Sequence, residues 1–235
     1  MAKIQSELLY MFSTELNYGE IKLSIILCTQ HKGGAGKTTL AVHMAGILTT
    51  QLNRILLIDC DTQRNAWFFY LRDKAQSPLE MQEYNDRLSI IWNPEREPIR
   101  RIADIQTYDH IILDMSTPLP DTVKVIVDND PDVILVPVSK HPWAIEGLSD
   151  TLPVISKLEE VAGFTPDVII VPLGSSKQVI NEKVQNISKL PINYKIANRM
   201  RDLNKEVDKA LNEGNLLWSY SGLEKLSTYF SSLLS

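Results

Sequence analysis

Residues 32–39 read Lys-Gly-Gly-Ala-Gly-Lys-Thr-Thr, an order of residue types suited to binding phosphate. Glycines let a turn direct several backbone N–H groups inward, and the amino end of a following helix adds partial positive charge. At the end of such a loop, Lys37 can reach the β- and γ-phosphates of a nucleotide, and the Thr38 hydroxyl can hold Mg²⁺. The sequence therefore predicts a nucleotide-phosphate site. The other residues expected to contact the nucleotide are Lys32, Gly33, Gly34, Ala35, Gly36 and Thr39.

Acidic residues end two further apolar runs. Asp59 and Asp61 follow one run, and Asp114 follows the other. The carboxyl ends of parallel strands meet at one edge of a sheet, where ligands bind. Carboxylates there suit Mg²⁺ coordination, often through water, and activation of an attacking water. We therefore predict a metal site made by Thr38, Asp59 and Asp114. The alternative is that these acids only end strands or cap helices.

The elements that would position these residues alternate along the chain. Six apolar runs predict strands at 23–29, 54–59, 89–92, 110–114, 132–138 and 167–172. Helices are predicted at 38–51, 64–74, 97–106, 119–127, 143–162, 176–188, 199–213 and 221–234, and 192–197 is either a seventh strand or a loop. The runs are nearly continuous in apolar residues, which is typical of strands buried on both faces. The predicted fold class is α/β: a doubly wound, mainly parallel sheet with helices on both faces.

Length and composition favour one soluble domain. The chain has 235 residues, of which 44% are hydrophobic and 23% charged, and its formal net charge is −5. We expect a single domain over 22–235 and an N-terminal extension over 1–21. No apolar run has the length of a membrane span, and the start of the chain lacks the features of a secretory signal. Cys28 and Cys60 lie in apolar runs and are expected to be buried thiols. The chain is expected to be cytoplasmic.

The phosphate-binding loop departs from the strict P-loop pattern. His31 stands where that pattern has glycine, and a second lysine, Lys32, precedes the paired glycines. This arrangement resembles the deviant Walker A motif of the ParA/MinD family of ATPases. Residues 59–65 resemble the family's Asp-x-Asp-Pro-Gln-x-Asn motif, with Thr62 in place of proline and Arg64 in place of a small residue. The run 110–114, His-Ile-Ile-Leu-Asp, is similar to a Walker B strand.

The resemblance implies a P-loop ATPase with ATP and Mg²⁺ as cofactors. It implies that Lys32 reaches the nucleotide of a partner subunit in an ATP-dependent homodimer, and that Asp61 activates the attacking water. Lys32, Lys37 and Asp61 are thus the expected catalytic residues. Pro172 would lie near the adenine. The implied activity is weak ATP hydrolysis that a partner protein stimulates.

The family offers more than one function. The first is ATP-gated, nonspecific DNA binding that positions a plasmid or a large protein assembly, with a small adaptor or centromere-binding protein as partner and the nucleoid as location. Residues 176–210 carry eight bases and four acids, a net charge of +4 that leaves −9 for the remainder. Phosphate contacts could come from this segment, although a solvated helical face is the alternative. The candidate DNA contacts are Lys195, Arg199, Arg201 and Lys205, with Arg199 and Arg201 at the start of the helix predicted over 199–213.

Two alternatives come from other branches of the family. A MinD-like ATPase needs a basic amphipathic tail for the membrane surface. The stretch from Leu217 to Ser235 has one base, Lys225, and we expect its apolar residues to pack in the core. A metabolic P-loop enzyme would need its own substrate residues. Residues 1–21 are too few for a helix-turn-helix domain, and their apolar residues could instead form a short docking helix.

Overall fold

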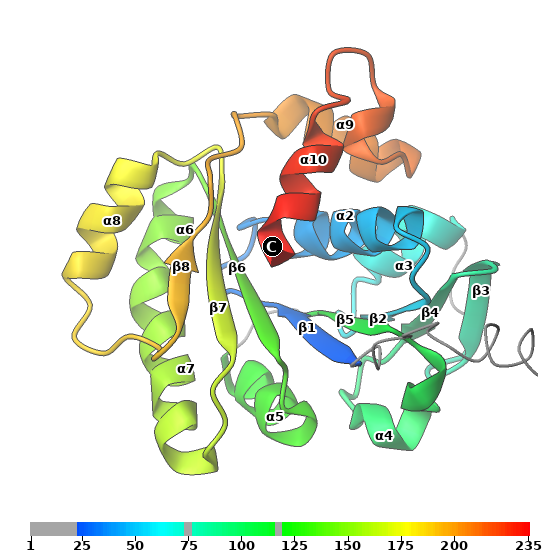
Figure 1. Ribbon diagram of the computed structural model, residues 1–235, viewed down its shortest axis with the longest axis horizontal. Helices are drawn as coiled ribbons and strands as arrows, with labels where there is room; N and C mark the ends of the chain where they lie inside the picture. Colours follow the sequence, from blue (N-terminus) through cyan, green and yellow to red (C-terminus); the bar gives the residue numbers. More distant parts are fainter. Residues whose placement is uncertain (1–22, 73–76, 116–118) are drawn as a thin grey trace, which may run out of the picture.

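The computed structural model describes residues 23–72, 77–115 and 119–235. The predicted extension, residues 1–21, lies outside these ranges. Figure 1 shows a central sheet with helices on both of its faces, which confirms the predicted α/β class.

The described strands form one sheet in the order β3-β4-β2-β5-β1-β6-β7-β8. Their bounds are Ser24–Cys28 (β1), Ile55–Asp59 (β2), Met81–Asn85 (β3), Leu88–Trp92 (β4), His110–Asp114 (β5), Val133–Ser139 (β6), Asp167–Leu173 (β7) and Tyr194–Ile196 (β8). Every pairing is parallel except that of β3 with β4. The sequence did not predict β3, because its residues, MQEYN, are mostly polar and exposed. The ambiguous run 192–197 contains the short edge strand β8.

The helices cover both faces of this sheet. Their bounds are Lys37–Thr50 (α2), Asn65–Leu71 (α3), Ile99–Ile102 (α4), Leu119–Asn129 (α5), Pro142–Glu146 (α6), Leu148–Ala162 (α7), Lys177–Gln185 (α8), Asn204–Glu213 (α9) and Leu226–Ser231 (α10). Single 3₁₀ turns occupy Ile105–Thr107 (η1), Leu217–Ser219 (η2) and Ser232–Leu234 (η3).

Several predicted helices are shorter or interrupted. The prediction over 97–106 is wrong, because that stretch holds only one turn of α4 and the turn η1, which the Asp104 carboxylate begins by accepting the N–H of Gln106. The helix predicted over 143–162 is interrupted at Gly147. The helix predicted from 199 begins only at Asn204. Met200 instead pairs with the end of β7, through its N–H to the Pro172 carbonyl and a bridge to Leu173, and no helix forms before Asn204.

Side chains of each buried strand alternate between two apolar clusters. On β1, Ile26 and Cys28 pack toward α2 and the C-terminal helices, whereas Leu27 packs toward α5, α7 and α8. Figure 1 shows the same division, with α2, α3, α9 and α10 on one side of the sheet. Cys28 and Cys60 are buried free thiols, as predicted.

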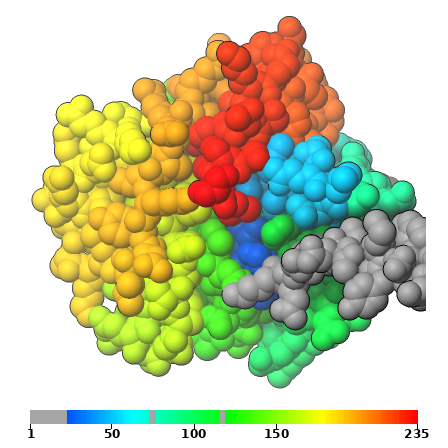
Figure 2. Space-filling view, in the orientation of Figure 1, coloured from blue at the N-terminus to red at the C-terminus, as the bar shows by residue number. Residues whose placement is uncertain are grey.

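The end of the chain packs onto α2. Figure 2 shows the red C-terminal residues lying between the blue surface of α2 and the strands at the yellow side of the molecule. Leu217, Phe230 and Leu233 are buried in the same cluster as the α2 side chains. The prediction that this tail packs in the core is therefore confirmed. Its predicted extent, 221–234, is too long, because regular helix covers only Leu226–Ser231.

Candidate nucleotide-binding site

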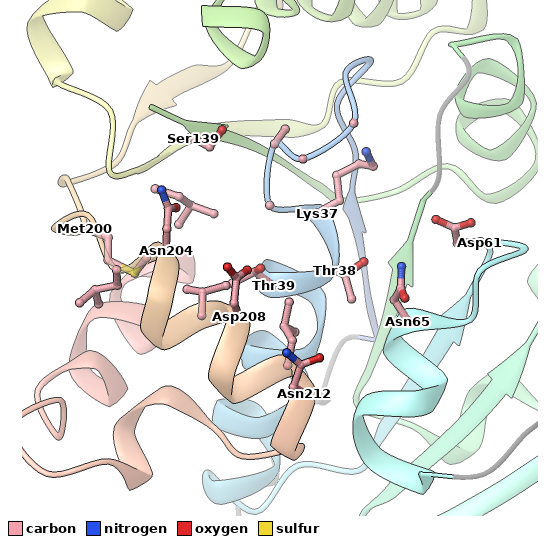
Figure 3. Close-up of a pocket in the computed structure, with 18 of the residues that line it drawn as sticks. Lys37, Thr38, Thr39, Asp61, Asn65, Ser139, Met200, Asn204, Asp208 and Asn212 are labelled. Carbon is pink, nitrogen blue, oxygen red and sulfur yellow. The ribbon is translucent and has the colours of Figure 1, made fainter. Parts of the chain in front are cut away.

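A pocket of about 620 Å³ opens at the carboxyl edge of the sheet, above the amino end of α2. The predicted loop residues Gly33 to Thr39 form its floor, and Asp61 and Asn65 form one wall. Figure 3 shows residues of α9 (Asn204, Asp208 and Asn212) extending into the pocket from another side. The predicted phosphate-binding loop therefore lies at the base of a pocket large enough for a small molecule.

Glycine is required in this loop by its backbone. Gly34 has φ +70° and Gly36 has φ +109°, in the left-handed region that other residues rarely adopt. A Cβ on Gly36 would also lie 2.4 Å from the Cδ1 atom of Leu173. The Gly36 carbonyl accepts the N–H of Leu40, so α2 starts directly after the loop and directs its amino end at the pocket. This arrangement is an anion-binding site.

Lys37 is the buried cation of the pocket. It is only 9% exposed, and its ammonium Nζ donates to the Lys32 carbonyl at 3.3 Å. Burial lowers the pKa of Lys37, while the charges of Asp114 and Asp61 act in the opposite direction. A desolvated ammonium beside inward-facing N–H groups fits the terminal phosphates of a nucleotide.

Asp59 and Asp114 are adjacent in the sheet and fully buried behind the loop. Asp59 accepts the backbone N–H of Asp61 with Oδ1 and that of Trp67 with Oδ2, both at 2.9 Å. Burial, the largest cause, raises the pKa of Asp59 to about 7. Asp59 therefore holds the following loop in place and would contact a metal ion only indirectly.

Asp114 differs from Asp59 in its hydrogen bonding. Neither of its buried carboxylate oxygens has a hydrogen-bond partner among the described residues. Burial and then the neighbouring Asp59 raise its pKa, and the nearby Thr38 hydroxyl lowers it. A buried carboxylate with so little help from neighbouring donors is costly unless a cation completes it. Together with Thr38, Asp114 fits a Mg²⁺ ion held by few protein groups, water and phosphate. Among the described residues, no group of three acidic, histidine or cysteine side chains could hold a metal ion.

Asp61 lies on the pocket wall, at the end of the loop after β2. Its Oδ1 accepts the N–H of Gln63 at 2.9 Å, and Oδ2 accepts no hydrogen bond from the described part of the chain. The carboxylate is thus held through Oδ1, and Asp61 lines the pocket.

Lys32 lies outside the pocket lining. Its ammonium is 3.5 Å from the Asp150 carboxylate on α7, and its side chain is 38% exposed. The two lysines of the loop therefore have different surroundings: Lys37 serves the pocket of its own chain, whereas Lys32 remains accessible at the surface.

The base-binding prediction is less accurate. Pro172 is buried in β7 and is not among the residues that line the pocket, whereas its neighbour Leu173 is. Sequence reasoning missed the rest of this wall, which consists of Phe68, Ser139, Met200, Leu203, Asn204, Val207, Asp208, Leu211 and Asn212. The four-residue spacing of Leu203, Val207 and Leu211 was a usable signal, because it marks one helix face.

The four candidate DNA contacts do not form one cluster on a helix. Lys195 on β8 donates to the Ser235 carbonyl at 2.8 Å, and Arg199 donates to the Gly174 carbonyl at 3.0 Å. Arg201 and Lys205 are exposed. The placement of Arg199 and Arg201 at a helix start is wrong, because α9 begins at Asn204.

Comparison with known proteins places this site in a family. The model of the CobQ/CobB/MinD/ParA nucleotide binding domain matches residues 26–234. The chain is 26% identical to the Maintenance of carboxysome distribution protein A of Gloeobacter kilaueensis over 129 residues, which are 54% of this chain and 55% of that protein. It is 28% identical to the sporulation initiation inhibitor protein Soj of Bacillus subtilis over 163 residues, 54% of this chain and 63% of Soj. The matches thus span little more than half the length of these two relatives.

Solved structures show the same fold. Apo McdA of Cyanothece superposes with a TM-score of 0.71 at 20% identity, covering 91% of this chain and 100% of that one. The cell division ATPase MinD of Pyrococcus furiosus gives a TM-score of 0.67 at 14% identity, covering 89% and 96%. The predicted cofactors occur among such structures, in the ATP complex of a Cyanothece McdA variant and in a MinD complexed with Mg-ADP.

Proposed function

The chain belongs to the CobQ/CobB/MinD/ParA nucleotide-binding family, and from that premise we propose that it is a positioning ATPase. ATP and Mg²⁺ bind in the pocket above α2, and the ATP-bound chain pairs with a second copy. Hydrolysis returns the pair to monomers, so that ATP acts as a timer for assembly. The cargo class is a plasmid or a large protein assembly, and a small adaptor or centromere-binding protein stimulates hydrolysis.

The two lysines of the phosphate-binding loop carry this proposal. A nucleotide in the pocket needs one buried cation from its own chain, and Lys37 supplies it. Lys32 lies outside that pocket, and its partly exposed side chain forms an ion pair with a half-exposed Asp150. Exposed ion pairs of this kind are weak, so Lys32 can leave Asp150 at little cost. Its accessibility supports a role toward the nucleotide of a second copy.

The residues of the pocket divide the work of hydrolysis. Backbone N–H groups from Gly33 to Gly36 and the ammonium of Lys37 bind the phosphates. Thr38 and Asp114 hold Mg²⁺, which neutralises charge on the phosphate oxygens when bound, and Asp59 supports them indirectly. Asp61 orients the attacking water through its free oxygen.

DNA binding is the finer part of the proposal. Arg201 and Lys205 are exposed near the start of α9, and we assign the nonspecific phosphate contacts to them first. Lys195 and Arg199 already bond to backbone carbonyls and would add less. Pairing of two chains doubles the number of phosphates contacted, so DNA retention should require ATP and fall with salt.

The alternatives have less support. Phe230 and Leu233 of the tail are buried against the body, so this apolar face does not present itself to a membrane surface. Within the ranges that the structure describes, no helix is long and apolar enough to cross a membrane. Cys28 and Cys60 are both buried, so neither can bridge subunits in the manner of an iron–sulfur reductase.

The test is the mass of the protein in solution. With Mg-ATP, the Asp61→Ala variant should elute from size exclusion with light scattering at twice the mass seen with ADP, because it binds ATP without hydrolysing it. Lys32→Ala should bind ATP with near-parent affinity but neither dimerise strongly nor hydrolyse. A monomeric Asp61→Ala variant with ATP bound, or full hydrolysis by Lys32→Ala, would refute the proposal.

DNA binding is measured separately. Arg201→Glu and Lys205→Glu should each lower the salt dependence of DNA retention by about one unit of slope. Glu substitution of Lys157, an exposed lysine on α7 outside the basic segment, is the matched control. Equal retention by all three variants would remove DNA from the proposal and leave the ATPase cycle in place.

A further inference from the structure

The loop that carries Asp61 lacks the proline that would stiffen it. Arg64 donates its backbone N–H to the Asp61 carbonyl at 3.2 Å, which closes a four-residue turn. Thr62 occupies the second position of this turn, where proline is favoured because its ring fixes φ. Threonine fixes no backbone angle. Something else in this chain must therefore hold the Asp61 backbone if its carboxylate is to stay aimed at the pocket.

Trp92, the last residue of β4, contacts this turn at two points. Its indole Nε1–H donates to the same Asp61 carbonyl at 2.9 Å. The carbon of the Arg64 guanidinium group lies 4.9 Å from the centre of its ring, which is cation–π distance. The parallel pairing of β2 with β4 sets Trp92 directly beside Asp59, two residues before Asp61. Its position is thus fixed by the sheet and not by the loop.

The backbone at Arg64 shows why this contact matters. Arg64 has φ +56°, a left-handed conformation that costs about 1 kcal/mol in a residue other than glycine. Arg64 donates its N–H to Asp61 and accepts the N–H of Phe68, and the contact with the indole ring adds a side-chain restraint directly before α3 begins. Without it, the turn gains freedom at its last residue and at the Asp61 carbonyl together.

We propose that Trp92 is a positioning residue for Asp61. It contacts the Asp61 carbonyl and the Arg64 side chain, and these contacts give the turn the rigidity that a proline at position 62 would supply. The inference rests on the proposed ATPase function and deepens it. Trp92 touches no nucleotide-binding residue of the loop 32–39 through a hydrogen bond, so it acts on the water-orienting step and not on ATP affinity.

The first test is Trp92→Phe, which keeps a ring in place and removes the N–H. We expect kcat for ATP hydrolysis to fall about tenfold, since a misplacement of about 1 Å can cost about 100-fold and the shift here should be smaller. The KM for ATP should stay within about twofold of the parent. Trp143→Phe, the same change at an exposed residue of α6, is the matched control and should leave kcat unaltered.

The second test is rescue by the residue that the turn prefers. The Thr62 N–H donates to no described residue, so Thr62→Pro removes no hydrogen bond that the structure shows. Trp92→Phe combined with Thr62→Pro should recover most of the lost kcat, whereas a loss caused by general destabilisation would persist. Hydrogen exchange gives a readout without turnover: the Arg64 amide should exchange faster in Trp92→Phe and return toward the parent rate in the double variant.

The outcomes of these experiments distinguish failure of the Trp92 inference from failure of the proposed ATPase function. A parent protein that hydrolyses no ATP, with or without DNA, counts against the proposed ATPase. A parent that hydrolyses ATP while Trp92→Phe retains its kcat overturns the positioning role alone. An unchanged exchange rate at Arg64 in Trp92→Phe overturns it as well, whatever the turnover.

Discussion

Two fully buried polar sites lie near α2, and they differ in how their polar atoms are paired. At the start of the helix, the Asp114 carboxylate has no hydrogen-bond partner among the described residues. One turn further on, His43 has both ring nitrogens occupied: Nδ1 lies 2.7 Å from the Thr39 carbonyl, and Nε2 accepts the N–H of Leu217 at 3.0 Å. The Asp114 carboxyl group and the His43 ring are equally buried, but only the His43 ring has hydrogen-bond partners at its polar atoms. A buried carboxyl group left without a hydrogen bond favours binding of a cation, whereas a paired group only stabilises the fold.

The largest predicted effect is on ATP affinity and comes from Lys37, the buried cation beside Asp114. Lys37→Ala should weaken ATP binding by about 100-fold or more, because the phosphates lose their only buried positive partner within the described pocket. Titration calorimetry with ATP measures this, and Lys157→Ala is the control for simple loss of a charge. Near-parent affinity in Lys37→Ala would contradict the phosphate assignment.

The hydrogen bonds of His43 lead to a prediction about how the stability of the protein depends on pH. Burial lowers the pKa of His43 to about 4, and a protonated ring could no longer accept the Leu217 N–H. An unfolded chain takes up this proton near pH 6.5, so the stabilisation is fully present above that pH and is lost as pH falls toward 4. The loss amounts to about 3 kcal/mol of unfolding free energy.

Denaturant unfolding at several pH values checks this prediction. His43→Gln should be less stable than the parent at pH 7 and should show a flatter dependence between pH 6.5 and 4. His110→Gln is the matched control, since burial also lowers the pKa of His110, which is only partly buried. An equal pH slope in His43→Gln and the parent would contradict the prediction.

The smallest predicted effect has the opposite sign. Asp114→Asn should stabilise the nucleotide-free protein by about 1 kcal/mol, because it replaces a carboxyl group whose ionised form is disfavoured by burial and by Asp59. The same variant should lose most of the thermal stabilisation that Mg-ATP gives the parent. Melting curves with and without Mg-ATP measure both quantities. A nucleotide-free variant less stable than the parent would mean that Asp114 is paired in solution and that the contrast with His43 does not hold.

The sequence predicted the parts of this molecule that are local. The loop 32–39 and the acids at 59, 61 and 114 sit in short motifs between apolar runs, so the type and order of neighbouring residues were sufficient. Local pattern was insufficient where distant segments decide the backbone. Residues 199–203 have helical composition, but Met200 pairs with β7 and the helix begins only at Asn204.

Residues brought in from other elements were also missed. Trp92 ends a strand and gave no sign of contact with the loop after β2, since that contact follows from strand order in the sheet. The wall formed by α9 follows from how the C-terminal segment lies across the pocket. The Trp92 contact and the α9 wall both depend on the order of strands and helices in space, which cannot be predicted directly from a single sequence.

The contact between His43 and Leu217 has a consequence for how the protein folds during its synthesis. The two residues are 174 positions apart, yet their hydrogen bond fixes the far side of the same helix that begins at the phosphates. During synthesis the loop 32–39 emerges early, while the segment that covers α2 emerges much later. Closure over so long a separation is slow. We therefore expect the nascent chain to bind nucleotide only after residues 217–233 are made, so that truncated translation products would not bind it.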